Sequence, residues 1–139
     1  MLDFLNITRA LGDENRIRIL MALREQDLCV CQVTAFLDLA PSTTSKHLSV
    51  LRQARLIESR KRGKWVYYHL AADSASPLVQ SALAWATENL KDNPVIIKDR
   101  EHMKKVLERE DLLGCKPDHE HQDYGHSIEL HLIDEEAIE

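Results

Sequence analysis

The spacing of hydrophobic positions along the chain predicts a protein built mainly from short helices. Apolar residues recur at intervals of three and four, and Gly12 and Pro41 interrupt the pattern. The expected helices lie at 3–11, directly after Asp13, at 31–39, from Ser42 to about Ala54, at 77–91 and at 98–112. The two consecutive helices that flank the tight break at Ala40-Pro41 are typical of a helix-turn-helix.

Residues 57–70 follow a different pattern, because apolar and polar positions alternate there. Ile57–Arg60 and Trp65–Leu70 are therefore expected to be extended. Residues 61–64 lie between them as a basic hairpin tip, in which Gly63 can form the turn. A basic hairpin directly after a helix-turn-helix is a wing. The predicted fold class is thus mainly α with a small β-hairpin wing, a winged helix-turn-helix.

Charge is distributed unevenly along the chain, because an acidic protein carries one strongly basic segment. The formal net charge is −5, yet residues 41–70 hold seven Lys/Arg against Glu58 alone. Residues 71–139 hold seven Lys/Arg against sixteen Asp/Glu. A basic segment within an acidic protein indicates a polyanionic partner, and double-stranded DNA is the one that a helix-turn-helix binds.

Four stretches of the sequence resemble one known family. They are Leu11–Arg16 (LGDENR), Leu28–Cys31 (LCVC), Ser42–Leu48 (STTSKHL) and Gly63–Tyr68 (GKWVYY), and they resemble the ArsR/SmtB family of winged helix-turn-helix repressors. The LCVC stretch looks like the arsenic- and antimony-responsive branch.

The resemblance covers roughly residues 3–92 and has clear implications. It implies a homodimer in which the first helix and the helix at 77–91 pair across the interface. It also implies that the dimer binds operator DNA without a cofactor and releases it when a metal or metalloid ion binds. Cytoplasmic transcription regulation is the expected role.

The candidate DNA-binding residues lie on the second helix of the motif and on the hairpin. Donors and acceptors near the start of that helix suit base edges, and cations suit phosphates. The helix is expected to turn Thr43, Thr44, Lys46 and His47 outward. The full candidate set is Ser42, Thr43, Thr44, Lys46, His47, Arg52, Arg60, Lys61, Arg62 and Lys64.

The pair Cys29 and Cys31 sets a geometric condition on ion binding. On a regular helix, residues two apart point about 200° away from each other, whereas in extended chain they lie on one side. The two thiolates can therefore hold one ion only if the backbone at 29–31 is not helical. Because this segment begins the first helix of the motif, ion binding there would distort the element that supports DNA reading.

The sequence is compatible with either two or three sulfur ligands for a bound ion. Arsenite and antimonite favour three soft sulfur ligands, but Thr34 occupies the place of the third cysteine in the family's arsenic pattern. We expect Cys115, from the same or the partner subunit, to complete a site with Cys29 and Cys31. The alternatives are two thiolates completed by water, a thiol-redox or persulfide-sensing pair, a cadmium- or zinc-type metal sensor, or an inert buried pair.

The C-terminal part of the chain is expected to form a second region. Residues 1–92 are expected to form the DNA-binding and dimerisation domain, and 93–139 a helix followed by an acidic, His-rich, partly flexible tail. The tail offers hard or borderline ligands for zinc, nickel or copper. They are Asp118, His119, His121, Asp123, His126 and His131.

Other function classes are disfavoured by the sequence. No apolar run approaches the ~18 residues of a membrane span, and no secretory signal is recognised, so a soluble cytoplasmic protein is expected. No phosphate-binding glycine loop and no nucleophile–base constellation occur, so we expect no enzyme.

Overall fold

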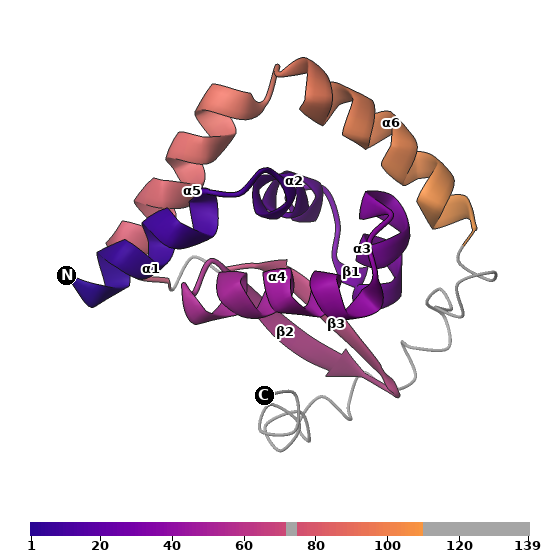
Figure 1. Cartoon of the computed structure of the whole chain (residues 1–139), viewed down its shortest axis with the longest axis horizontal. Helices are drawn as coiled ribbons and strands as arrows, with labels where there is room; N and C mark the ends of the chain where they lie inside the picture. The colour runs from indigo at the N-terminus through magenta and orange to yellow at the C-terminus, as the bar shows by residue number, and fades with distance from the viewer. Residues whose placement is uncertain (72–74, 110–139) are drawn as a thin grey trace.

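The computed structural model describes residues 1–71 and 75–109 and has the predicted fold class. Its helices are α1 (Leu2–Leu11), α2 (Glu14–Leu23), α3 (Val30–Leu37), α4 (Pro41–Gln53), α5 (Pro77–Leu90) and α6 (Pro94–Glu108). Its strands are β1 (Leu28–Cys29), β2 (Ile57–Arg62) and β3 (Trp65–Leu70). Figure 1 shows α5 and α6 as an arch above α2, with α3, α4 and the sheet below.

The helix-turn-helix consists of α3 and α4 and is set by local backbone chemistry. Asp38 ends α3 in the left-handed conformation with φ of 58°, which aspartate tolerates better than most residues. Its N–H donates to the Thr34 carbonyl at 2.8 Å. Pro41 then stands in the first turn of α4, where its missing N–H costs nothing.

The wing is an antiparallel hairpin that carries a third strand. The sheet order is β1-β3-β2, with Arg62 opposite Trp65 at the tip and Gly63 turning the chain at φ of 63°. Strand β2 extends to Arg62, two residues beyond the predicted end. Strand β1 was not predicted, since two residues are too short to show alternation; it pairs Cys29 with Tyr67.

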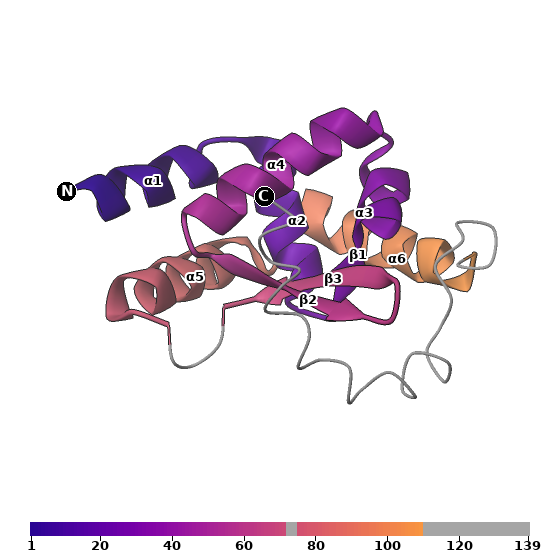
Figure 2. The same ribbon diagram turned by 90° about the horizontal axis from the view of Figure 1, so that it is seen from below.

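The core lies where α2, α3 and α4 meet the sheet. Ile19, Leu28, Leu48, Leu51 and Leu56 are each at most 1% exposed. In Figure 2, α4 and the sheet lie on opposite sides of α2, which is consistent with this shared core. The core holds α3 and α4 as one rigid unit, because close-packed side chains resist displacement.

The last helix begins earlier than predicted. Asn93 caps α6, since its side chain accepts a hydrogen bond from Val95 N–H at 2.9 Å, and Pro94 follows in the first turn. The prediction of a helix at 98–112 was therefore wrong at its start, and residues 110–112 lie outside the described residues. The sequence Asn93-Pro94 both ends one helix and begins the next.

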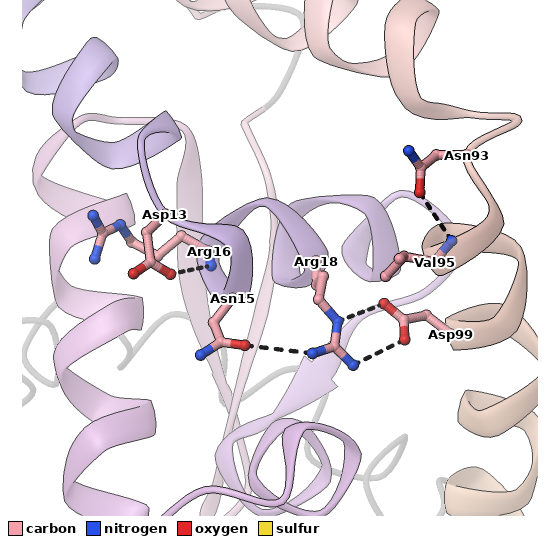
Figure 3. Close-up of polar contacts among 7 residues, drawn as sticks. All are labelled: Asp13, Asn15, Arg16, Arg18, Asn93, Val95 and Asp99. Carbon is pink, nitrogen blue, oxygen red and sulfur yellow. Dashed lines mark hydrogen bonds and ion pairs between the residues drawn. The ribbon is translucent and has the colours of Figure 1, made fainter.

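α6 is tied to α2 by an ion pair (Figure 3). Arg18 of α2 donates to both carboxylate oxygens of Asp99, at 2.8 and 2.9 Å. The hydrogen bond with Asp99 raises the pKa of Arg18 above its ordinary value. Met103 and Val106 of α6 are part of the same core as α2–α4. The division of the chain after residue 92 stays a prediction.

Candidate DNA-binding surface and thiol site

The outward face of α4 is short, polar and exposed. Ser42, Thr43, Ser45, Lys46 and Ser49 are all exposed, and we call these five residues the reading face. Ser45 and Ser49 were missed at first, although they lie three and seven residues after Ser42 and so share its side of the helix. The reading face can offer hydroxyl donors and acceptors together with one cation.

Thr44 does not belong to this face, and the prediction that it points outward was wrong. Its side chain is fully buried, at 0% exposure, and its Oγ1 has no hydrogen-bond partner. The position precedes Leu48 by four residues and Leu51 by seven, so it lies on the inward stripe of α4. Periodicity, rather than residue type, was the correct guide here.

His47 is only partly available for contact with a ligand. It is half-buried, and its Nδ1 lies 3.2 Å from Arg16 Nη1. Arg16 also donates to the carbonyls of Ala10 and Arg9, at 2.9 and 3.0 Å. His47 thus joins α4 to the α1–α2 junction and is held in place by it.

The basic residues of the wing differ in their surroundings. Lys64 is exposed at the tip, with Nζ 6.0 Å from the centre of the Trp65 ring. Arg62 donates to Asp27 Oδ2 at 2.9 Å and stacks over the Tyr67 ring at 4.9 Å. Arg62 is therefore a structural link between the wing and the segment before β1 as well as a surface cation.

The remaining cations among the candidate residues lie around the hairpin and the end of α4. Arg52, Arg60 and Lys61 are half-buried. Arg52 lies close enough to lower the pKa of Tyr68, although burial, the larger cause, raises it. These side chains add positive charge beside the reading face without being fully exposed.

Cys29 and Cys31, which we call the thiol pair, meet the geometric condition derived from the sequence only in part, because Cys31 lies within α3. Cys29 precedes α3 with extended backbone, φ of −90° and ψ of 168°, so its side chain is not placed by helical geometry. The two Sγ atoms lie 2.9 Å apart. Each sulfur is the other's partner, and neither cysteine is free.

The thiol pair stands at the junction of three elements. Cys29 belongs to β1 and pairs with Tyr67 of the wing strand β3. Its N–H donates to Gln32 Oε1 at 3.0 Å, which fixes the first turn of α3. Any displacement of Cys29 therefore acts on the wing and on the first helix of the motif at once.

The surroundings of the thiol pair are mostly apolar. Cys29, Cys31, Trp65 and Tyr67 form a small cluster separate from the main core. Beside them is a groove of about 560 Å³, which we call the thiol groove. It is lined by Cys29, Val30, Cys31, Thr34, Ala35, Asp38, Leu39, Pro41, Trp65 and Val66.

The third expected sulfur lies beyond the part of the chain that the structure describes. Cys115 and the tail ligands Asp118, His119, His121, Asp123, His126 and His131 all lie outside residues 1–71 and 75–109, so those predictions stay untested. Within these two ranges, no group of three or more His, Cys, Asp or Glu side chains could hold a metal ion. The described part of the site is a two-sulfur site.

Large apolar side chains are exposed on α1 and on α5. In both views α1 projects from the body of the molecule on the side of α5 (Figures 1 and 2). The exposed fractions of Leu2, Phe4, Leu5 and Trp85 are 69%, 53%, 51% and 65%. Exposed large apolar side chains on neighbouring helices are typical of a protein–protein interface.

The fold and the surface described above define a winged helix-turn-helix regulator, and comparison with known proteins identifies its family. Residues 13–59 match the family described as "Bacterial regulatory protein, arsR family". The chain is 35% identical over 82 residues to the cadmium resistance transcriptional regulatory protein CadC homolog of Staphylococcus aureus, spanning 58% of this chain and 68% of the relative. The chain belongs to the ArsR family.

Two further comparisons agree with this result. Over 65 residues the chain is 42% identical to the arsenic resistance transcriptional regulator ArsR1 of Pseudomonas putida, spanning 46% of this chain and 51% of the relative. It thus covers about half the length of that relative, and of several others. The structure of HlyU from Vibrio cholerae superimposes with a TM-score of 0.55 at 26% identity, covering 66% of this chain and 95% of that one.

Among the residues that the structure describes, none of the helices combines the length and apolar character needed to cross a bilayer.

Proposed function

We propose that this protein is a homodimeric transcriptional repressor that leaves its operator DNA when a thiophilic ion, As(III) or Sb(III), binds the thiol pair in the cytoplasm. The observation that carries the proposal is the 2.9 Å approach of two sulfurs at the junction of α3 and the wing. Membership of the ArsR family and the name of the P. putida relative support it.

DNA binding is assigned to the reading face and the wing. Ser42, Thr43 and Lys46 would contact base edges and phosphates in the major groove, with Ser45 and Ser49 beside them. The basic residues Arg52, Arg60, Lys61, Arg62 and Lys64 would contact the backbone, and His47 would hold α4 in position. Each phosphate contact adds about −0.9 to the slope of log affinity against log salt.

Dimerisation is assigned to α1 and α5. The exposed side chains of Phe4, Leu5 and Trp85 are the apolar surface that a second copy would bury. A dimer would present two reading faces to two half-sites, which multiplies the contacts with one duplex.

Release follows from the position of the thiol pair. An ion held by both sulfurs would impose its own ligand geometry on Cys29, which is bonded to Gln32 and paired with Tyr67. The start of α3 and the wing strand would shift with it. Cys115, from either subunit, is proposed as the third sulfur for an inorganic ion.

The test is release of DNA by single-cysteine variants. A duplex selected from a random library for binding to the protein would be labelled, and its fluorescence anisotropy followed as arsenite is added. Cys29→Ser and Cys31→Ser are expected to bind DNA normally and to need at least 100-fold more arsenite for release, because thiolate outranks hydroxyl for this ion. Normal release by both variants would refute the proposal.

A redox sensor is the second candidate, because an oxidant could join two sulfurs 2.9 Å apart. In that reaction each thiol loses one proton and one electron to the oxidant. Adding diamide, arsenite and cadmium separately to the protein–DNA complex distinguishes the candidates. Release by diamide alone favours the redox sensor, and release by cadmium alone favours a cadmium-type sensor of the kind named for the S. aureus relative.

A further inference from the structure

The charge of the chain divides at the end of α6. Residues 1–109 hold seventeen Lys/Arg against thirteen Asp/Glu, a formal charge of +4, and residues 110–139 hold one Lys against ten Asp/Glu, a formal charge of −9. The two parts together give the net charge of −5. We call residues 110–139 the acidic tail. The part of the chain that contains the helix-turn-helix and the wing is therefore basic, and the acidic tail alone makes the protein acidic.

The positive charge is concentrated on the surface to which DNA binding is assigned. Residues 41–70 hold seven Lys/Arg against Glu58 alone. In the part of the chain that the structure describes, Lys46 of the reading face and Arg60 and Lys64 of the wing make no ion pair with a carboxylate. Cations gathered on one surface attract any polyanion, whether its charges are phosphates or carboxylates. The surface therefore suits an acidic polypeptide as well as DNA.

The position of α6 fixes the point from which the acidic tail starts. α6 ends at Glu108, and both views show this end on the side of the molecule that carries α3 and the tip of the wing (Figures 1 and 2). The ion pair of Arg18 with Asp99 holds the helix in this place. Thirty residues span up to about 100 Å when extended, whereas a domain of this size has a radius of gyration of about 13 Å. The acidic tail is therefore long enough to reach both the wing and the reading face.

We propose that the reading face and the wing also bind the protein's own acidic tail, which DNA must displace. The inference rests on the proposed function, because it uses the DNA-binding surface assigned there, and it adds a second occupant of that surface. Carboxylates of the acidic tail would take the places of DNA phosphates on Lys46, Arg60 and Lys64. A segment tethered to its own binding surface has an effective concentration of about 1 mM. A contact with a Kd of about 0.1 mM would therefore be formed in most molecules.

The first experiment removes the charge of the acidic tail in the full-length chain. Its Asp and Glu residues are replaced by Asn and Gln, so no described residue changes. At about 50 mM salt this variant should bind the selected duplex about tenfold more tightly than the unaltered protein. The difference should fall below about twofold at about 300 mM salt, because the contact between tail and surface is screened. The replaced residues are Glu110, Asp111, Asp118, Glu120, Asp123, Glu129, Asp134, Glu135, Glu136 and Glu139.

The second experiment detects the contact itself and so separates docking from a general effect of net charge. A water-soluble carbodiimide joins a carboxylate to a lysine amine that touches it, and the water lost in forming the amide converts the carbodiimide to a urea. In the DNA-free, unaltered protein we expect cross-links from the acidic tail to Lys46 and Lys64, located by mass spectrometry. The selected duplex should abolish them. Cross-links to Lys91, an exposed residue at the end of α5, should be rare and unaffected by the duplex.

The outcomes separate this inference from the proposed function. Equal affinities of the two proteins for DNA at low salt would overturn the docking of the acidic tail. Cross-links confined to Lys104 and Lys105, near the end of α6, or cross-links that the duplex leaves unchanged, would overturn it as well. In each of these cases a loss of DNA binding in Lys46→Glu would still support the assignment of DNA binding to the reading face. If Lys46→Glu binds DNA normally, that assignment fails and this inference fails with it.

Discussion

The reading face of α4 and the thiol pair before α3 belong to one helix-turn-helix, yet their surroundings are opposite. Lys46 and its neighbours are exposed, whereas Cys29 is 3% exposed and hydrogen-bonded into both the sheet and α3. A surface that contacts DNA needs side chains that can be changed without cost to the fold. A sensor needs side chains whose movement displaces the neighbouring helices and strands. Buried side chains do this because they are packed against those elements.

The largest effect is expected from a substitution in the buried segment that contains Cys29. Leu28, next to Cys29 in β1, is fully buried, so Leu28→Ala should lower the free energy of unfolding by about 3 kcal/mol through lost contacts and a cavity. Chemical denaturation measures it. Ile97→Ala, at a position 46% exposed on α6, is the matched control with little effect; equal costs for the two would contradict the contrast.

The next largest effect is expected from a substitution in the exposed reading face. Lys46→Glu should weaken binding of the selected duplex about 100-fold, since a phosphate contact becomes a repulsion, and should leave the melting temperature unchanged. Lys98→Glu makes the same charge change at an exposed position of α6. If both variants lose affinity equally, the effect is one of net charge and the reading face is wrongly assigned.

Arg62 is partly exposed and also contacts neighbouring residues, so its substitution should affect both DNA binding and stability to an intermediate degree. Arg62→Ala removes a surface cation and the contacts to Asp27 and Tyr67. We expect about tenfold weaker DNA binding, a salt slope reduced by about 0.9, and a stability loss of at most about 1 kcal/mol because the pair is partly solvent-exposed. Lys64→Ala is the control: it should alter the salt slope but not stability.

Much of the fold could be predicted from the sequence because its signals are local. Periodicity located the helices, and Gly63 between alternating segments located the hairpin. Strand β1 and the contact between Cys29 and Tyr67 could not be predicted, since pairing between residues 38 positions apart leaves no local pattern. The same holds for Arg18 and Asp99, whose ion pair joins helices distant in sequence.

The candidate site was predicted in part. Helix geometry predicted that Cys29 and Cys31 can share one ion only where the backbone at 29–31 is not helical. In the structure Cys29 is extended, whereas Cys31 lies within α3, so this condition is met at Cys29 alone. The groove beside them was not foreseen, because it is made by α3 and the wing together. DNA-binding roles stay predictions, and Thr44 shows the weakness of assigning them by polarity alone.

Thr44 provides the smallest and most discriminating prediction. Its buried hydroxyl has no hydrogen-bond partner, so Thr44→Val removes an unsatisfied polar group while keeping shape. Stability should stay equal or rise by up to about 1 kcal/mol, and DNA affinity should not change. Thr43→Val, one residue earlier and exposed, should weaken DNA binding without changing stability. A loss of affinity in Thr44→Val that matches Thr43→Val would show that α4 rotates when it meets DNA, since a side chain buried in this arrangement cannot reach a base.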